Sequence, residues 1–526
     1  MLKKILLSSI AMAAFTAAAQ DVKVGLSAEP TSIDPHYHDA FYNTSVLFNL
    51  YDGLIALDDT MQIRPGLAES WEVVSPTVWR FKLRDGVTFH DGSSFGAEDV
   101  IYSIRRIKNG HVINSPSPFT TYVATISDIR DIGDNVIEIE TASPDPVLLN
   151  NLSFVGIISS PKDDVKFIEA DDPIETWPES LEFNDGKLAN GTGPYKFKSF
   201  KTGDQLILEK NADYWGGAPA ADTAYLYPMP DNGARTAALI SGQVQVIDAV
   251  PVADIYRIDE NENLALVSAP SAITIFFMFD QFGETTPKIE GKNPFLDQRV
   301  RKAFLQAIDR DTILENIMEN IAEPADQMIP PTMAGYATDY VRPAYDPEAA
   351  KALLAEAGYP NGFKMTINAP NDRYVNDEKT AQAIAQMLAR VGVDAQVETF
   401  PRSVYFTNAS NFDFSLYMGA TGAETGDASK ALAAMVHSRD LDNGWGGGNR
   451  GRYANPKADA LIEEAFTTVD ADKRYAMYAE ASKIFAEDVA TIPLYHVVGV
   501  FGTSKDVNFT PRMDQRMYLP NIAFNN

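Results

Sequence analysis

Hydrophobic and polar residues alternate at several places in the first half of the chain, as they do in strands with one buried face. The clearest cases are residues 22–26, 78–83, 136–140, 205–209 and 273–279. Residues 97–108 instead carry acids in a first helical turn and bases in a last one, which suits the dipole of a helix. This half therefore predicts mixed α and β structure.

Helical periodicity becomes more frequent in the second half. Residues 296–308 carry apolar side chains at helical spacing, and Asp346 with Pro347 forms a helix start that Gly358 closes. Further predicted elements are a strand at 364–368, a helix at 379–391, a strand at 395–398, and helices from 456 and at 472–486. Helices that alternate with strands predict an α/β unit with a partly parallel sheet.

The first residues have the pattern of a cleaved export signal. Met1–Gln20 contains Lys3 and Lys4, then the apolar stretch Ile5–Phe15, then the small residues Ala17–Ala19. A buried N-terminal helix is the alternative. A lipid anchor would need a cysteine after the cleavage site, and the chain has none. We therefore expect an exported protein that is not a lipoprotein, located in the periplasm.

Composition excludes several classes of protein. The 526 residues exceed the length of about 250–300 at which a single core stops growing, so two or three domains are expected. The 72 acidic and 44 basic residues give a net charge of −28, which argues against nucleic acid as a partner. Without cysteine, the chain has no disulfide, thiolate metal site or cysteine nucleophile.

No catalytic motif is evident. His36 and His38 are the only close histidine pair and lack the HExxH context of a zinc protease. There is no GxSxG motif, and the glycine-rich stretch Gly444–Gly448 lacks the Lys-Ser/Thr of a phosphate-binding loop. No feature of the sequence indicates a glycosidase with two catalytic carboxylates. A binding protein without catalytic residues is the expectation.

Four blocks of sequence carry a resemblance that spans most of the chain. They are Tyr51–Ser103 (with RPGLAESW and LRDGVTFHDG), Gly191–Gly217 (with GTGPYKF and YWGG), Asn293–Asp309 and Asn455–Tyr495. In this order the blocks resemble the extracytoplasmic solute-binding proteins of ABC transporters, family 5, the peptide- and nickel-type group. The aromatic and turn residues in them are expected to be structural rather than ligand-binding.

The resemblance implies a bilobed periplasmic-binding-protein fold of type II, an α/β fold with an extra domain on the first lobe and two hinge crossings. Lobe I would be discontinuous and the other parts continuous. The expected divisions are 1–20 for the signal peptide, 20–50, 187–270 and 495–526 for lobe I, 51–186 for the extra domain, and 271–494 for lobe II.

The family's ligand contacts suggest residues on lobe II. In dipeptide-binding members an Arg after a strand holds the ligand carboxylate, and Arg373 has that place here; the alternative is a surface Arg paired with Asp372 or Asp377. The family's amine-binding Asp corresponds to Ala423. Either the neighbouring Glu424 or Asp427 takes that role, or the ligand is not a plain dipeptide.

Three further residues are candidates for the ligand site. Trp445 and Asn449 lie in a glycine-rich loop, where backbone can approach a ligand and an indole can stack on it. His38 lies near the expected first crossing between the lobes. No metal ligand set, catalytic residue or cofactor is predicted.

The resemblance implies a periplasmic protein that captures a short peptide or related amino-acid conjugate and delivers it to an ABC permease in the inner membrane. A monomer is expected. Opines, oligosaccharides and metal chelates are alternative ligands. A secreted hydrolase with cleft carboxylates and a receptor that signals through a membrane partner are alternative functions.

Overall fold

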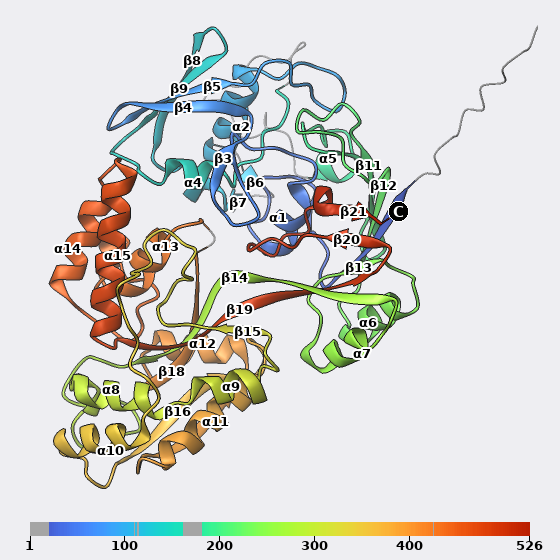
Figure 1. The fold of residues 1–526 in the computed structure, drawn as a ribbon. Helices are drawn as coiled ribbons and strands as arrows, with labels where there is room; N and C mark the ends of the chain where they lie inside the picture. Colours follow the sequence, from blue (N-terminus) through green and yellow to red (C-terminus); the bar gives the residue numbers. More distant parts are fainter. Residues whose placement is uncertain (1–19, 110, 113–114, 161–180, 424, 526) are drawn as a thin grey trace, which may run out of the picture.

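The computed structural model describes residues 20–109, 111–112, 115–160, 181–423 and 425–525 (Figure 1). The predicted signal peptide, apart from Gln20, and the candidate Glu424 lie outside the described residues.

An eleven-stranded sheet runs through both halves of the molecule (Figure 1). Its main path follows the order β10 (Tyr195–Lys201), β11 (Gln205–Lys210), β12 (Thr223–Pro228), β1 (Asp21–Leu26), β13 (Val246–Ile247), β19 (Thr491–Ser504), β14 (Leu264–Phe279), β18 (Leu416–Gly422), β16 (Lys364–Pro370) and β17 (Asp394–Phe400), with β15 (Ala322–Pro324) paired to β19 beside it.

Two lobes share this sheet. Lobe I holds β10 to β13 and β1, with α1 (Phe41–Leu47), α5 (Leu181–Asn184), α6 (Asn232–Ile240), α7 (Ile255–Asp259), and the hairpin of β20 (Val507–Phe509) and β21 (Ile522–Phe524). Lobe II holds β15 to β18 with α8 (Gln298–Ala307), α9 (Arg310–Asn316), α10 (Pro347–Glu356), α11 (Asp377–Ala389), α12 (Arg402–Ser410), α13 (Ser429–Ala431), α14 (Pro456–Ala465) and α15 (Ala471–Glu487).

The extra domain is a separate sheet with its own core. Its strand order is β4 (Ala68–Ser75), β5 (Val78–Leu83), β9 (Val136–Thr141), β8 (Ile126–Gly133). Around it lie β2 (Ile55–Leu57), β3 (Ile63–Pro65), β6 (His111–Val112), β7 (Ser115–Pro116), α2 (Ala97–Asn109), α3 (Thr120–Val123) and α4 (Leu148–Leu152).

Strands β14 and β19 connect the two lobes. Residues 264–270 of β14 pair with 498–504 of β19 in lobe I, and Ile273–Phe279 pair with β18 in lobe II. The β14–β19 register is irregular between Pro270 and Thr274, where the strands pass from one lobe to the other. The predicted divisions after residues 270 and 494 fall within these two strands, and the domain boundaries stay predictions.

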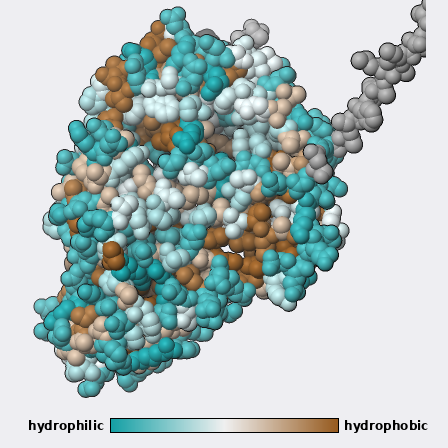
Figure 2. Space-filling view, in the orientation of Figure 1, coloured by the Kyte–Doolittle hydropathy of each residue, from teal (hydrophilic) through white to brown (hydrophobic). Residues whose placement is uncertain are grey.

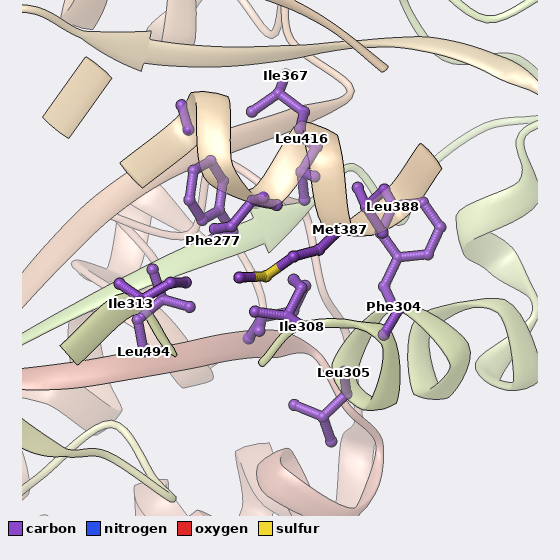
Figure 3. Close-up of a cluster of buried hydrophobic side chains, with 14 of the residues drawn as sticks. Phe277, Phe304, Leu305, Ile308, Ile313, Ile367, Met387, Leu388, Leu416 and Leu494 are labelled. Atoms are coloured by element: carbon purple, nitrogen blue, oxygen red, sulfur yellow. The ribbon is translucent and has the colours of Figure 1, made fainter. Parts of the chain in front are cut away.

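Lobe II is built around the helices that the sequence predicts. Asp346 caps α10 by accepting hydrogen bonds from the backbone N–H groups of Glu348 and Ala349, and Gly358 follows it at φ +96°. In Figure 3, Met387 of α11 lies among Ile308, Phe277 and other apolar side chains from the sheet and from α8. The packing of these helices against the sheet positions the loops that follow the strands of lobe II.

Candidate functional site

The directions of the paired strands define one place where loops from both lobes meet. Strands β12 and β13 run parallel to β1, and β13 and β14 are both antiparallel to β19, so β1, β12 and β13 point toward lobe II. Strand β18 is antiparallel to β14, and β16 and β17 run parallel to β18's direction, so they point back toward lobe I. The carboxyl ends of both strand sets therefore face one another across β14 and β19.

Ligands of α/β sheets bind outside the carboxyl ends of strands, where the strand order reverses. In lobe II the chain leaves β16 through α11 to β17 on one side, then returns through α12 to β18 on the other. The reversal brings the loop 371–376 and the residues that follow β18, Ala423 and 425–428, to one edge. Figure 2 shows hydrophobic residues gathered at the level of β14 and β19, and a further group over the extra domain at the upper left.

Arg373 lies in the first of these loops and is exposed. The two acids that were the alternative partners are engaged elsewhere: Asp377 accepts the backbone N–H groups of Arg373 (3.1 Å) and Tyr374 (3.0 Å), and Asp372 accepts that of Arg402 (2.6 Å). Among the described residues, no carboxylate forms an ion pair with the Arg373 side chain, whose guanidinium lies 5.1 Å from the ring centre of Tyr374.

The charges of two more arginines act on Tyr374, and the sequence reasoning missed them. Burial raises the pKa of Tyr374 and the negative charge of Asp377 raises it further, whereas the positive charges of Arg373, Arg450 and Arg402 lower it. Within the described part of the chain none of the three forms an ion pair; Arg450 donates only to the hydroxyl of Ser410, at 3.2 Å. This edge of an acidic protein is therefore locally cationic and suited to a ligand with carboxylate groups.

Asp427 reaches the same edge but is buried. Its Oδ1 accepts the backbone N–H of Ser429 at 3.0 Å and the Ser429 hydroxyl, while no described residue donates to Oδ2. Burial raises the pKa of its carboxyl group. Nearby, the Asn150 amide of the extra domain donates to the carbonyl of Thr425 at 2.6 Å. The structure thus places Asp427 against the contact between lobe II and the extra domain, and its ligand role stays a prediction.

The glycine-rich loop is firmly packed within lobe II. The Asn449 amide donates to the carbonyls of His437 (3.0 Å) and Tyr453 (2.8 Å) and accepts the Tyr453 N–H (3.1 Å). Trp445 stacks on His437 with ring centres 4.7 Å apart and meets Phe466 edge-on. Both side chains thus contact residues of lobe II, and their roles in binding stay predictions.

His38 belongs to lobe I, apart from the lobe II candidates. Its side chain is exposed, and its Nδ1 lies 3.2 Å from the hydroxyl oxygen of Thr31. Its ring contacts those of Tyr37 and Tyr42 edge-on. Thr31 follows the carboxyl end of β1, so His38 is near the lobe I edge.

A hydrogen-bond network fixes that edge. Asp248 accepts the backbone N–H (2.6 Å) and the hydroxyl (2.9 Å) of Ser27, and the buried Arg235 donates to the carbonyls of Met229 (2.7 Å) and Ala249 (2.8 Å). These contacts tie together the ends of β1, β12 and β13. Sequence reasoning missed this network, because its partners are far apart along the chain.

Neither a metal site nor a membrane-spanning helix is found among the described residues. No group of three or more His, Asp or Glu side chains there is placed to hold a metal ion. No helix in that part of the chain has the length and apolar character needed to cross a membrane.

Two α/β lobes that share a pair of strands and turn their carboxyl edges toward one another define a two-lobed binding protein. The model of the bacterial extracellular solute-binding proteins, family 5, matches residues 62–443. The chain belongs to this family of solute-binding proteins.

Individual relatives agree with this assignment. The chain is 29% identical over 490 residues to the glutathione-binding protein GsiB of Shigella dysenteriae, covering 92% of this chain and 90% of the relative. It aligns with the periplasmic binding protein DppA from Helicobacter pylori in complex with the peptide STSA at 25% identity and a TM-score of 0.70, covering 97% and 98% of the two chains. It also aligns with the unliganded open form of the murein tripeptide binding protein MppA at 22% identity and a TM-score of 0.81, with the same coverage.

Proposed function

We propose that this protein is the periplasmic substrate-binding component of an ABC importer, and that it captures a short peptide or related amino-acid conjugate between its two lobes. The single observation that carries the ligand class is a group of three arginines, Arg373, Arg402 and Arg450, whose charges act on Tyr374 at the carboxyl edge of lobe II and which form no ion pair with any described residue. Peptides bring a carboxylate, which a guanidinium binds through two parallel hydrogen bonds.

The relatives support a peptide-like ligand. The GsiB relative is named for glutathione, a tripeptide conjugate with two carboxylates, which would match more than one arginine at this edge. Of the two solved structures above, the unliganded open form of MppA aligns with the higher TM-score. This is in keeping with a cleft that a ligand would close. Asp427 or Glu424 would hold the amine, and Trp445, Asn449 and His38 remain candidate contacts.

In this proposal ligand binding acts as a switch. A ligand that touches both carboxyl edges binds the closed arrangement more tightly than the open one, so it shifts the population toward the closed form. The inner-membrane permease would recognise that form. The protein would act as a monomer, exported through a cleaved signal peptide at residues 1–20 and carrying no lipid anchor.

A thermal-shift screen followed by calorimetry tests the ligand class. The panel is a set of dipeptides, glutathione, an opine, an oligosaccharide and a nickel–histidine complex. A ligand at 100 times its Kd should add about 2.7 kcal/mol of stability. Stabilisation by peptides or glutathione supports the proposal. Stabilisation by the oligosaccharide alone would contradict it, and hydrolysis products in the peptide or glycan samples would favour a hydrolase.

A further inference from the structure

A cavity of about 190 Å³ lies outside the cleft, between lobe I and the extra domain. Its walls come from α1, the segment around β2, and the stretch 512–518 near the C-terminus; they include Phe48, Ile55, Trp215, Arg516 and Tyr518. No lobe II residue lines it. A cavity of about 150 Å³ in another protein holds benzene, so this one has room for a small aromatic ring with a polar group.

Arg516 is a buried cation on this wall, with only 8% of its surface exposed. Its guanidinium lies 4.5 Å from the ring centre of Phe48 and 5.0 Å from that of Phe154, so two aromatic rings hold it. The nearest carboxylate oxygen is Oδ2 of Asp514, 3.8 Å from Nε. Its side-chain nitrogens have no hydrogen-bond acceptor among the described residues.

The neighbouring Arg512 differs from Arg516, because its side chain has several hydrogen-bond acceptors. Arg512 is also buried, but it donates to Asp514 (2.7 Å), to the carbonyl of Leu57 (3.0 Å) and to Asp59 (3.3 Å). Asp514 is therefore the counter-charge of both arginines, and only Arg512 donates side-chain hydrogen bonds to it. A buried cation that shares its carboxylate and has no side-chain hydrogen bond among the described residues favours a further anion beside it.

A carboxylate in the lining limits the charge of that anion. Asp52 lines the cavity, and its oxygens accept hydrogen bonds from Tyr214 (3.0 Å), Trp215 (2.8 Å) and Thr192 (2.8 Å). These three donors leave Asp52 little to offer a ligand, and a second negative group placed near it would be disfavoured.

We propose that this cavity is a second binding site, distinct from the cleft, for a small monocarboxylate with a flat apolar body. The carboxylate binds the guanidinium of Arg516, and the apolar body packs against Phe48, Ile55 and Tyr518. An occupant would join lobe I to the extra domain, so it would stabilise their contact.

Calorimetry with benzoate as the probe tests the site in the full mature protein. Benzoate is expected to bind, Arg516→Gln to weaken its binding at least tenfold, and the neutral isostere benzamide to bind at least tenfold more weakly than benzoate. Arg373→Gln, the same substitution in the cleft, should leave benzoate binding unchanged. Equal affinities for Arg516→Gln and the unaltered protein, or loss of benzoate binding in Arg373→Gln, would overturn the proposal.

Diffraction provides a readout that needs no variant, in case Arg516→Gln fails to fold. Crystals soaked with 4-bromobenzoate should show an anomalous bromine peak inside the cavity beside Phe48. A peak only between the lobes, or none at a concentration that saturates binding in calorimetry, would contradict the site.

Discussion

At the scale of single residues, Arg373 gives the most direct test of the cleft. Its side chain has no ion-pair partner in the described part of the chain, so removing it should cost little stability. Arg373→Ala is expected to weaken binding of a carboxylate-bearing ligand by about 2–5 kcal/mol, as when a charged hydrogen-bonded pair loses one member. Calorimetry measures this loss, with Arg390→Ala at the exposed C-terminal end of α11 as the control. Unchanged affinity would remove Arg373 from the site.

His36 gives a prediction about pH. Arg106 donates to its Nδ1 (2.8 Å), so its Nε2–H donates to the carbonyl of Gly156 (2.8 Å), and burial lowers the pKa of His36 to about 4. Because the unfolded chain takes up a proton near pH 6.5 and the folded one does not, stability should fall as pH drops from 6.5 to 4. The fall is on the order of 2–3 kcal/mol.

Denaturant unfolding at a series of pH values checks this loss. His36→Gln should show a smaller decrease between pH 6.5 and 4 than the unaltered protein, whereas His38→Gln, an exposed neighbour, should keep the full decrease. Identical curves for His36→Gln and the unaltered protein would show that His36 does not contribute.

Sequence reasoning at this scale succeeded only where one local pattern specifies a position. It placed Arg373 after a strand, where the structure has it. It could not find that the charges of Arg402 and Arg450 act on Tyr374 together with that of Arg373, because the three arginines lie on segments that are distant along the chain. Nor could it tell that the amide of Asn449 is satisfied by the backbone of His437 and Tyr453, since a glycine-rich pattern does not specify hydrogen-bond partners.

At the scale of elements, α11 tests how lobe II is held. Met387 is buried between the helix and the sheet (Figure 3), so Met387→Ala removes apolar contacts and leaves a cavity. The expected loss is about 2–5 kcal/mol of unfolding free energy. Gln386→Ala, at an exposed position of the same helix, should lose nothing. Denaturant unfolding of both variants measures the difference, and equal stabilities would contradict the packing.

The elements themselves divide into predictable and unpredictable ones for a physical reason. Helix α10 was predicted almost to the residue, because its cap and its terminating glycine are local. Strand β14 was predicted only over residues 273–279, although it begins at Leu264. Its first part contains Pro270 and a weak alternation, and it is held by pairing with β19, more than two hundred residues away.

At the scale of the whole molecule, the prediction concerns closure. The lobes are connected through β14 and β19, so a ligand bound to both carboxyl edges should rotate them together. Small-angle X-ray scattering should show a smaller radius of gyration with saturating ligand, and Arg373→Ala at the same ligand concentration should show less change. Calorimetric binding without any change in the scattering curve would argue against closure.

The path of the chain through lobe I also bears on the order of folding. Strand β13 pairs with residues 502–503 of β19, so the lobe I sheet cannot be completed until the last part of the chain is present. Within lobe II, β16 pairs with β17 and β18, which are much closer to it along the chain than β12 and β13 are to β1, so this part should fold first. Pulsed hydrogen exchange during refolding should protect α11 and β16 before β1. A chain that emerges from its N-terminus would then begin to fold lobe II while lobe I waits for residues 502–503 of β19.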